Sequence, residues 1–166
     1  FESYLDVYDV LDLSYLFSFD TENGPQWSTE SLLIQNDMLY VAINNAYDYG
    51  NYKGIVGVID LTNMSYVNEV DLGEDGKNPI NLLYRNGFIY AINNKNWDGS
   101  SVSVINVDNI NTQTINLSNV SNGCGVSIVR GDELCYQVSN SAQMFKFDLT
   151  NLEEIGLVDN FEYNYY

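Results

Sequence analysis

Apolar and polar residues alternate in short runs along the chain, and the pattern is clearest between residues 78 and 106. Two apolar runs, Ile80 to Tyr84 and Phe88 to Ile92, lie on either side of Asn86-Gly87, a dipeptide typical of two-residue hairpin turns. A third run, Val102 to Ile105, follows a polar loop and alternates between valine and serine. The pattern predicts three antiparallel strands that follow one another in a meander.

The same unit recurs on both sides of this stretch. Three segments resemble one another as second strands, each with a tyrosine: Met38 to Asn44, Phe88 to Asn93 and Glu133 to Ser139. We align them on Tyr40, Tyr90 and Tyr136. A fourth apolar run follows each third strand, at Tyr15 to Phe19, Tyr66 to Leu72, Thr114 to Leu117 and Glu154 to Val158. The chain is therefore predicted to be a repeat protein.

Four strands in roughly 45 residues is the size of one β-propeller blade, and no helical periodicity is sustained. We therefore expect an all-β fold of four-stranded antiparallel blades, about three and a half in number, forming an open or partial propeller. The chain would begin in the third strand of a blade, at Glu2 to Val10. The predicted units are 1–23 for the last two strands of this blade, then 24–73, 74–118, and 119–166 with an aromatic tail.

An open arc of blades leaves its two end faces uncovered. Internal blade faces are apolar, so we expect two exposed apolar faces that are larger than the patch a monomer normally exposes. We expect these faces to be covered by further blades, by a second copy, or by a partner chain.

Composition removes several classes of function. The formal charge is −17, and a surface this negative repels phosphate, so nucleic-acid binding is not expected. Because no apolar run reaches about 18 residues, we expect no membrane insertion. The chain has no histidine, which removes the usual general base and the commonest metal ligand. We expect neither a cofactor nor a metal.

The middle unit carries a recognisable motif. Asn78-Pro79 enters the first strand, Tyr90-Ala-Ile-Asn93 lies in the second, and Ser101-Val-Ser-Val-Ile-Asn106 forms the third. This unit resembles the YVTN-type β-propeller repeat, related to surface-layer and quinoprotein-like propellers. The other two full units depart from it, with Ser28-Thr29 and Cys124-Gly125 in place of Asn-Pro.

That resemblance implies an exported protein of a bacterial or archaeal surface, or of the periplasm, that binds rather than catalyses. Some proteins of this type are surface lipoproteins that capture cobalamin.

A binding site is expected on one set of loops. In a propeller, loops between the second and third strands share a face with loops that enter the first strand, and loops commonly carry function. Aromatic side chains beside carboxylates suit a small molecule, a glycan or a protein partner. The alternative is that the aromatic rings pack against neighbouring loops. The candidate residues are Trp27, Tyr47, Asp48, Tyr49, Tyr52, Asn78, Trp97, Asp98 and Cys124.

Two further features are candidates for a metal site and for a disulfide. Residues 94–100 are similar to the start of a calcium loop, but Ile105 stands where a bidentate glutamate should close the site, so a turn stabilised by Asn and Asp is favoured. Cys124 and Cys135 would lie about four residues apart along the ladder, roughly 13 Å, too far for a disulfide. We expect Cys135 to be a small core residue.

Three functions remain open. The leading interpretation is a non-enzymatic binding or interaction propeller that uses the aromatic and acidic loop face. The second is a glycosidase or lyase that uses a carboxylate pair such as Asp48 and Asp98. The third is a structural segment of a larger surface assembly.

Overall fold

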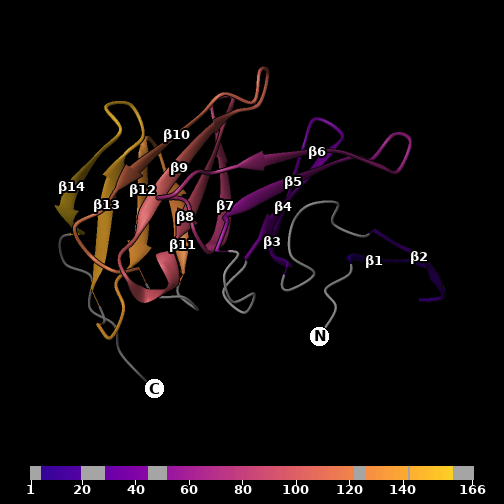
Figure 1. Ribbon diagram of the computed structural model, residues 1–166, viewed down its shortest axis with the longest axis horizontal. Helices are drawn as coiled ribbons and strands as arrows, with labels where there is room; N and C mark the ends of the chain where they lie inside the picture. Colours follow the sequence, from indigo (N-terminus) through magenta and orange to yellow (C-terminus); the bar gives the residue numbers. More distant parts are fainter. Residues whose placement is uncertain (1–4, 20–28, 45–51, 122–125, 142, 159–166) are drawn as a thin grey trace.

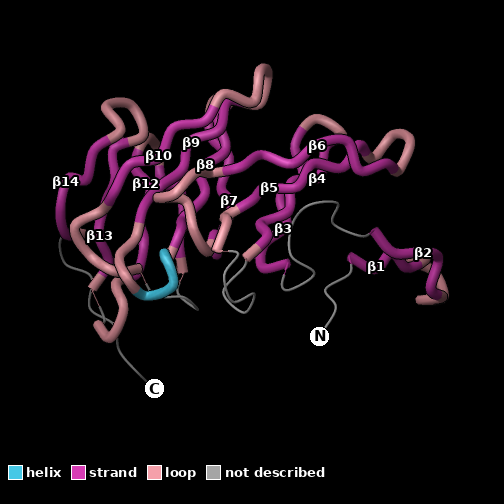
Figure 2. Tube along the Cα trace, viewed as in Figure 1, coloured by secondary structure: helices cyan, strands magenta, loops and turns pink. Residues whose placement is uncertain are grey.

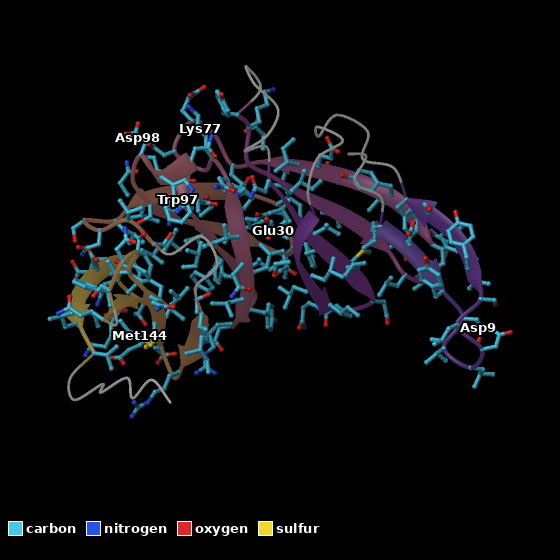
Figure 3. All side chains as sticks on the ribbon, turned by 90° about the horizontal axis from the view of Figure 1, so that it is seen from below. Asp9, Glu30, Lys77, Trp97, Asp98 and Met144 are labelled. Carbon is cyan, nitrogen blue, oxygen red and sulfur yellow. The ribbon has the colours of Figure 1, made fainter. Side chains whose placement is uncertain are left out.

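The computed structural model describes residues 5–19, 29–44, 52–121, 126–141 and 143–158. Within these residues the chain forms fourteen β-strands in four antiparallel sheets. Figure 1 shows the sheets following one another in chain order, and Figure 3 shows them arranged as an open arc. The single short 3-10 helix of the described residues lies in a loop (Figure 2). No helix in the described part of the chain is long and apolar enough to cross a membrane.

The first sheet has two strands, and each of the other three has four strands that pair in sequence order. This confirms the expected all-β architecture of four-stranded blades. The two-stranded sheet contains β1 (Leu5–Tyr8) and β2 (Tyr15–Phe19). The first four-stranded sheet contains β3 (Thr29–Gln35), β4 (Met38–Ile43), β5 (Ile55–Asp60) and β6 (Ser65–Asp71).

The second four-stranded sheet contains β7 (Pro79–Arg85), β8 (Phe88–Asn93), β9 (Ser101–Asn106) and β10 (Thr112–Asn116). The third contains β11 (Ser127–Arg130), β12 (Glu133–Gln137), β13 (Met144–Asp148) and β14 (Glu153–Leu157).

Local sequence explains how the first two strands of a blade are joined. Arg85 pairs with Phe88, and the two residues between them both have positive φ, 49° at Asn86 and 85° at Gly87. This combination is the two-residue turn that matches the twist of antiparallel strands, and asparagine and glycine adopt it at the lowest cost. The hairpin predicted from Asn86-Gly87 is therefore confirmed.

The sheets pack face to face through apolar side chains. One cluster joins the first and second four-stranded sheets and includes Tyr40, Leu82 and Ile89. A second cluster joins the second and third of these sheets and includes Tyr90 and Tyr136. A third cluster places the two-stranded sheet against β4 and β5. The core is thus a series of interfaces between neighbouring sheets, as in a stack of blades.

The alignment of Tyr136 with Tyr90 was wrong. Phe88 pairs with Asn106, and Glu133 pairs with Asp148, so Glu133 occupies the position of Phe88 and Cys135 that of Tyr90. Because successive side chains on a strand point to opposite faces, the shift of one residue moves Tyr136 to the other face of its sheet. Cys135 is a buried free thiol, as expected for a small core residue.

The first sheet also differs from expectation. Its opening strand ends at Tyr8, before the predicted end at Val10, because Asp9 accepts a hydrogen bond from Leu11 N (2.7 Å) and starts a turn. The outward face of this sheet is not apolar. Ser18 donates to Asp6 (2.6 Å), and the rings of Tyr8 and Tyr15 meet edge to face at 5.9 Å. Polar groups on this face satisfy one another, so it tolerates solvent.

Candidate functional site

Two loops of the second four-stranded sheet lie against each other. The loop before β7 and the loop between β8 and β9 are joined by backbone hydrogen bonds from Asn94 N to Asn78 O (2.9 Å) and from Lys95 N to Lys77 O (3.0 Å). For this sheet, the prediction that these two classes of loop share a face is confirmed. We call the segment 94–100 the Trp97 loop.

The Trp97 loop has an unusual backbone. Lys95, Asn96 and Trp97 have φ values of 51°, 57° and 68°, so three consecutive residues with side chains adopt the left-handed conformation. Each such residue costs roughly 1–2 kcal/mol, less for asparagine, and single residues rather than runs are the norm. A run of three persists only when the surrounding structure holds it, and backbone strain of this kind is concentrated at functional sites.

The buried side chain of Asn94 holds the turn. Its Oδ1 accepts hydrogen bonds from Trp97 N (2.9 Å) and from Asn78 Nδ2 (3.2 Å), and its Nδ2 donates to Ser121 O (2.8 Å). These contacts join the Trp97 loop to the loop before β7 and to the start of the next sheet. The interpretation of residues 94–100 as a turn stabilised by side-chain amides agrees with this geometry.

A second set of contacts joins the loop to its surroundings through Lys95. Lys95 Nζ donates to Asp75 Oδ1 and to Asn116 Oδ1, both at 2.7 Å. The hydrogen bonds from Lys95 and then Asn116 keep the pKa of the Asp75 carboxyl below its ordinary value. The Lys95 side chain is 19% exposed and that of Asp75 is 49% exposed, so solvent screens this pair in part.

This framework presents Trp97 to solvent. Trp97 is 58% exposed although its backbone N–H is hydrogen-bonded to Asn94, and Asp98, the next residue, is exposed as well. Lys77 forms an ion pair with Glu74 (3.0 Å). Figure 3 shows Trp97, Asp98 and Lys77 on the same side of the molecule. The arrangement places an exposed aromatic ring and a carboxylate on the same side of the molecule as an ion pair.

The sequence-predicted residues fall into three groups. Asn78, Trp97 and Asp98 belong to the two joined loops, where Asn78 is buried and supports the turn. Tyr52 is exposed and precedes Gly54, whose carbonyl accepts from Leu72 N at the start of the loop before β7. Trp27, Tyr47, Asp48, Tyr49 and Cys124 lie outside the described residues.

The sequence analysis missed Asn94, Lys95 and Asp75 as residues that build the site. The run Asn93-Asn94-Lys95-Asn96 was a usable signal, because asparagine tolerates the left-handed conformation better than other residues with side chains. Sequence spacing does not indicate the Lys95–Asp75 pair, because the two residues belong to different loops that come together only in the folded chain.

In the described part of the chain, no group of three or more Cys, Asp or Glu residues is placed to hold a metal ion. The Asn94 carboxamide oxygen, the first ligand in a calcium-type reading of the loop, already accepts two hydrogen bonds.

Comparison with known proteins identifies the fold. Neither a protein-family profile nor a curated protein sequence matches the chain. Solved structures do match over most of it. The Kuenenia stuttgartiensis hydrazine synthase matches at a TM-score of 0.64 and 16% identity, over 88% of this chain and 46% of that chain. The Neurospora crassa Pan2 WD40 domain matches at 0.61 and 15%, over 92% and 46%.

A third structure decides the architecture. The β-propeller domain of Myceliophteria thermophila Cps50 (Swd1) matches at a TM-score of 0.62 and 13% identity, over 95% of this chain and 49% of that chain. The chain is a partial β-propeller. It spans less than half the length of these three solved chains. At such low identity the likeness shows the fold alone, so the YVTN family is not established by it.

Proposed function

We propose that this partial propeller is a non-enzymatic binding module, and that the Trp97 loop is the centre of its contact surface. The observation that carries the proposal is an exposed tryptophan on a strained turn that buried side chains hold in place. Glycine would adopt this backbone conformation at lower cost, and backbone strain of this kind is concentrated at functional sites.

A fixed backbone makes an exposed aromatic ring an effective anchor. Tryptophan is enriched among the residues that dominate binding energy. A side chain whose backbone is already ordered loses less conformational entropy on binding, so more of the contact energy appears as affinity. Asn94 and Lys95 supply that order before any ligand arrives.

Charge indicates which ligands suit the surface. Five of the six basic residues are paired with carboxylates, through Lys53–Asp71, Lys77–Glu74, Arg85–Asp132, Lys95–Asp75 and Lys146–Glu133. Few basic side chains of the chain itself are therefore left to neutralise the excess of acidic residues. One of these acidic residues, Asp98, follows Trp97 directly in the sequence. An aromatic ring beside a carboxylate suits a cationic side chain or a hydroxylated ring that stacks on the indole.

The middle blade's resemblance to the YVTN-type repeat supports assigning the protein to exported binding propellers of a cell surface or the periplasm. The aromatic loop face is the feature on which such a role would depend.

The test compares Trp97 with an aromatic residue of matched exposure. A glycan array and a library of arginine- and lysine-containing peptides would be screened with the wild-type chain and with Trp97→Ala and Tyr15→Ala. Tyr15 is 57% exposed but lies on β2, in the first sheet. We expect bound probes to be lost with Trp97→Ala and kept with Tyr15→Ala. Binding that survives Trp97→Ala, or no binding to either probe class, would refute the proposal.

A further inference from the structure

Within the described residues, the first sheet has an unpaired edge. Among the described residues, β1 pairs with β2 alone, whereas the matching strands β5, β9 and β13 each pair on both sides. The free edge of β1 therefore carries backbone N–H and C=O groups that a further strand can bind. By comparison with the other three sheets, the described part of this sheet lacks two strands, the first two of a blade.

The first four-stranded sheet carries an exposed apolar surface on β3. Leu32 is 54% exposed and Ile34 is 66% exposed. The matching residue to Leu32 in the next blade is Leu82, because Leu32 pairs with Val41 as Leu82 pairs with Ala91. Leu82 is only 4% exposed. This position of the repeat is thus buried in the second four-stranded sheet and exposed in the first.

The difference has a structural cause. Leu82 is covered by residues of the preceding blade, including Leu33 on β3 and Tyr40 on β4. Leu32 faces the place where the first two strands of the first sheet would lie. The cross-strand partners of Leu32 and Ile34, Val41 and Leu39, are buried in the cluster that β1 and β2 complete. The exposed surface therefore continues an interface that already exists.

We propose that the unpaired edge of β1 and the exposed face of β3 bind a two-stranded β-hairpin of a partner chain, which pairs with β1 and covers Leu32 and Ile34. The proposal is independent of the Trp97 loop. The repeat specifies the chemistry of the hairpin. Its first strand carries a leucine at the position of Leu33 and Leu83, and its second strand carries a tyrosine at that of Tyr40 and Tyr90.

A second copy of the chain does not supply such a hairpin from its described residues. Every described strand from β3 to β14 already belongs to a complete four-stranded sheet, and β1–β2 is itself the incomplete sheet. Donating a hairpin would require a second copy to dismantle one of its own blades.

The chain contains a ready probe, because residues 79–93 form the hairpin β7–β8 with the specified leucine and tyrosine. A fluorescein-labelled synthetic peptide of this sequence would be titrated against the protein by anisotropy. A control peptide carries lysine in place of Leu83 and Tyr90. Protein variants would be Ile34→Asp and, as the matched control, Ile128→Asp, because Ile128 is 56% exposed on the last blade.

We expect saturable binding of the peptide, an affinity about tenfold weaker for Ile34→Asp, and less than a twofold change for Ile128→Asp. Bound peptide should slow hydrogen–deuterium exchange of the β1 amides, because strand addition consumes their free hydrogen-bonding edge. The control peptide should do neither.

Three results would overturn the proposal. The first is no saturable binding of the peptide to wild-type protein. The second is equal weakening by Ile34→Asp and Ile128→Asp, which would indicate nonspecific adhesion. The third is a dimer in sedimentation velocity that Ile34→Asp dissociates, which would make a second copy the occupant.

Discussion

Asn94→Ala should show what holds the strained turn. The substitution removes one side chain that makes three hydrogen bonds and leaves the amide of Asn78 and the carbonyl of Ser121 without these partners. Both of those groups belong to buried residues, so water does not readily replace the lost contacts. A buried polar group left unpaired costs about 1–3 kcal/mol, whereas a typical intact hydrogen bond contributes about 1 kcal/mol net.

Three bonds at about 1 kcal/mol each predict a loss of about 3 kcal/mol in the free energy of unfolding. Part of that loss is recovered if the left-handed residues relax, so we expect a measured loss of about 2–3 kcal/mol. For a chain of this size, 1 kcal/mol shifts the melting temperature by about 2–4 °C. The expected fall in melting temperature is therefore roughly 4–12 °C.

Two measurements check this result. Urea unfolding gives the stability change, and acrylamide quenching of Trp97 fluorescence, in a Trp27→Phe background, reports whether the turn has relaxed. The matched control is Asn109→Ala, which removes a single exposed hydrogen bond to Asn111 N (2.9 Å). We expect that control to cost less than about 1 kcal/mol and to leave quenching unchanged.

The reasoning fails if Asn94→Ala costs no more than Asn109→Ala and the quenching of Trp97 stays at its wild-type value. In that case the left-handed turn would be held by something other than the buried amide, and the Lys95–Asp75 contact would be the next candidate.

Three other predictions concern the scaffold. Gly54→Ala should cost more than about 3 kcal/mol in urea unfolding, because its Cβ would lie 1.7 Å from the Gly76 carbonyl oxygen. Gly87→Ala should cost about 1 kcal/mol, because its φ of 85° is strained for any side chain although no atom lies within 4 Å of the added carbon. Burial alone would raise the pKa of Glu154, but hydrogen bonds from Ser118 and Tyr136 lower it below its ordinary value of 4.5. A lowered folded-state pKa stabilises the protein above about pH 4.5, and this contribution is lost as pH falls through the folded value. Glu154→Gln should therefore flatten the dependence of stability on pH in that acidic range, as followed by urea unfolding at a series of pH values.

The fold was predictable because its signals are local. Asn86-Gly87 specifies a hairpin turn whatever its surroundings, and runs such as Phe88 to Ile92 recur at the spacing of a blade. The misplacement of Tyr136 shows where local signals end. Aligning segments by residue similarity does not detect a one-residue error in the position of a strand. Such an error nevertheless moves every side chain of that strand to the other face of the sheet.

The site was less predictable because it depends on contacts between loops. Trp97 and Asp98 could be singled out by residue type and by their place between two strands. The left-handed run and the buried role of Asn94 could not, because both depend on Asn78 and Ser121, which are distant in the sequence. Asparagine in a loop indicates turn chemistry, but not which carbonyl its side chain will meet.

The two ends of the arc are chemically different, and this follows from comparing equivalent positions. Val104 pairs with Tyr90 on the face that contacts the next blade, and Lys146 pairs with Cys135 at the same place in the last blade. Lys146 forms an ion pair with Glu133 there (3.7 Å). Covering that face with an apolar blade would remove water from the ion pair. The free-energy cost of this desolvation is commonly larger than the gain from the attraction between the two charges. A neighbour on the last sheet must therefore meet charge, whereas a hairpin next to β1 would cover Leu32 and Ile34.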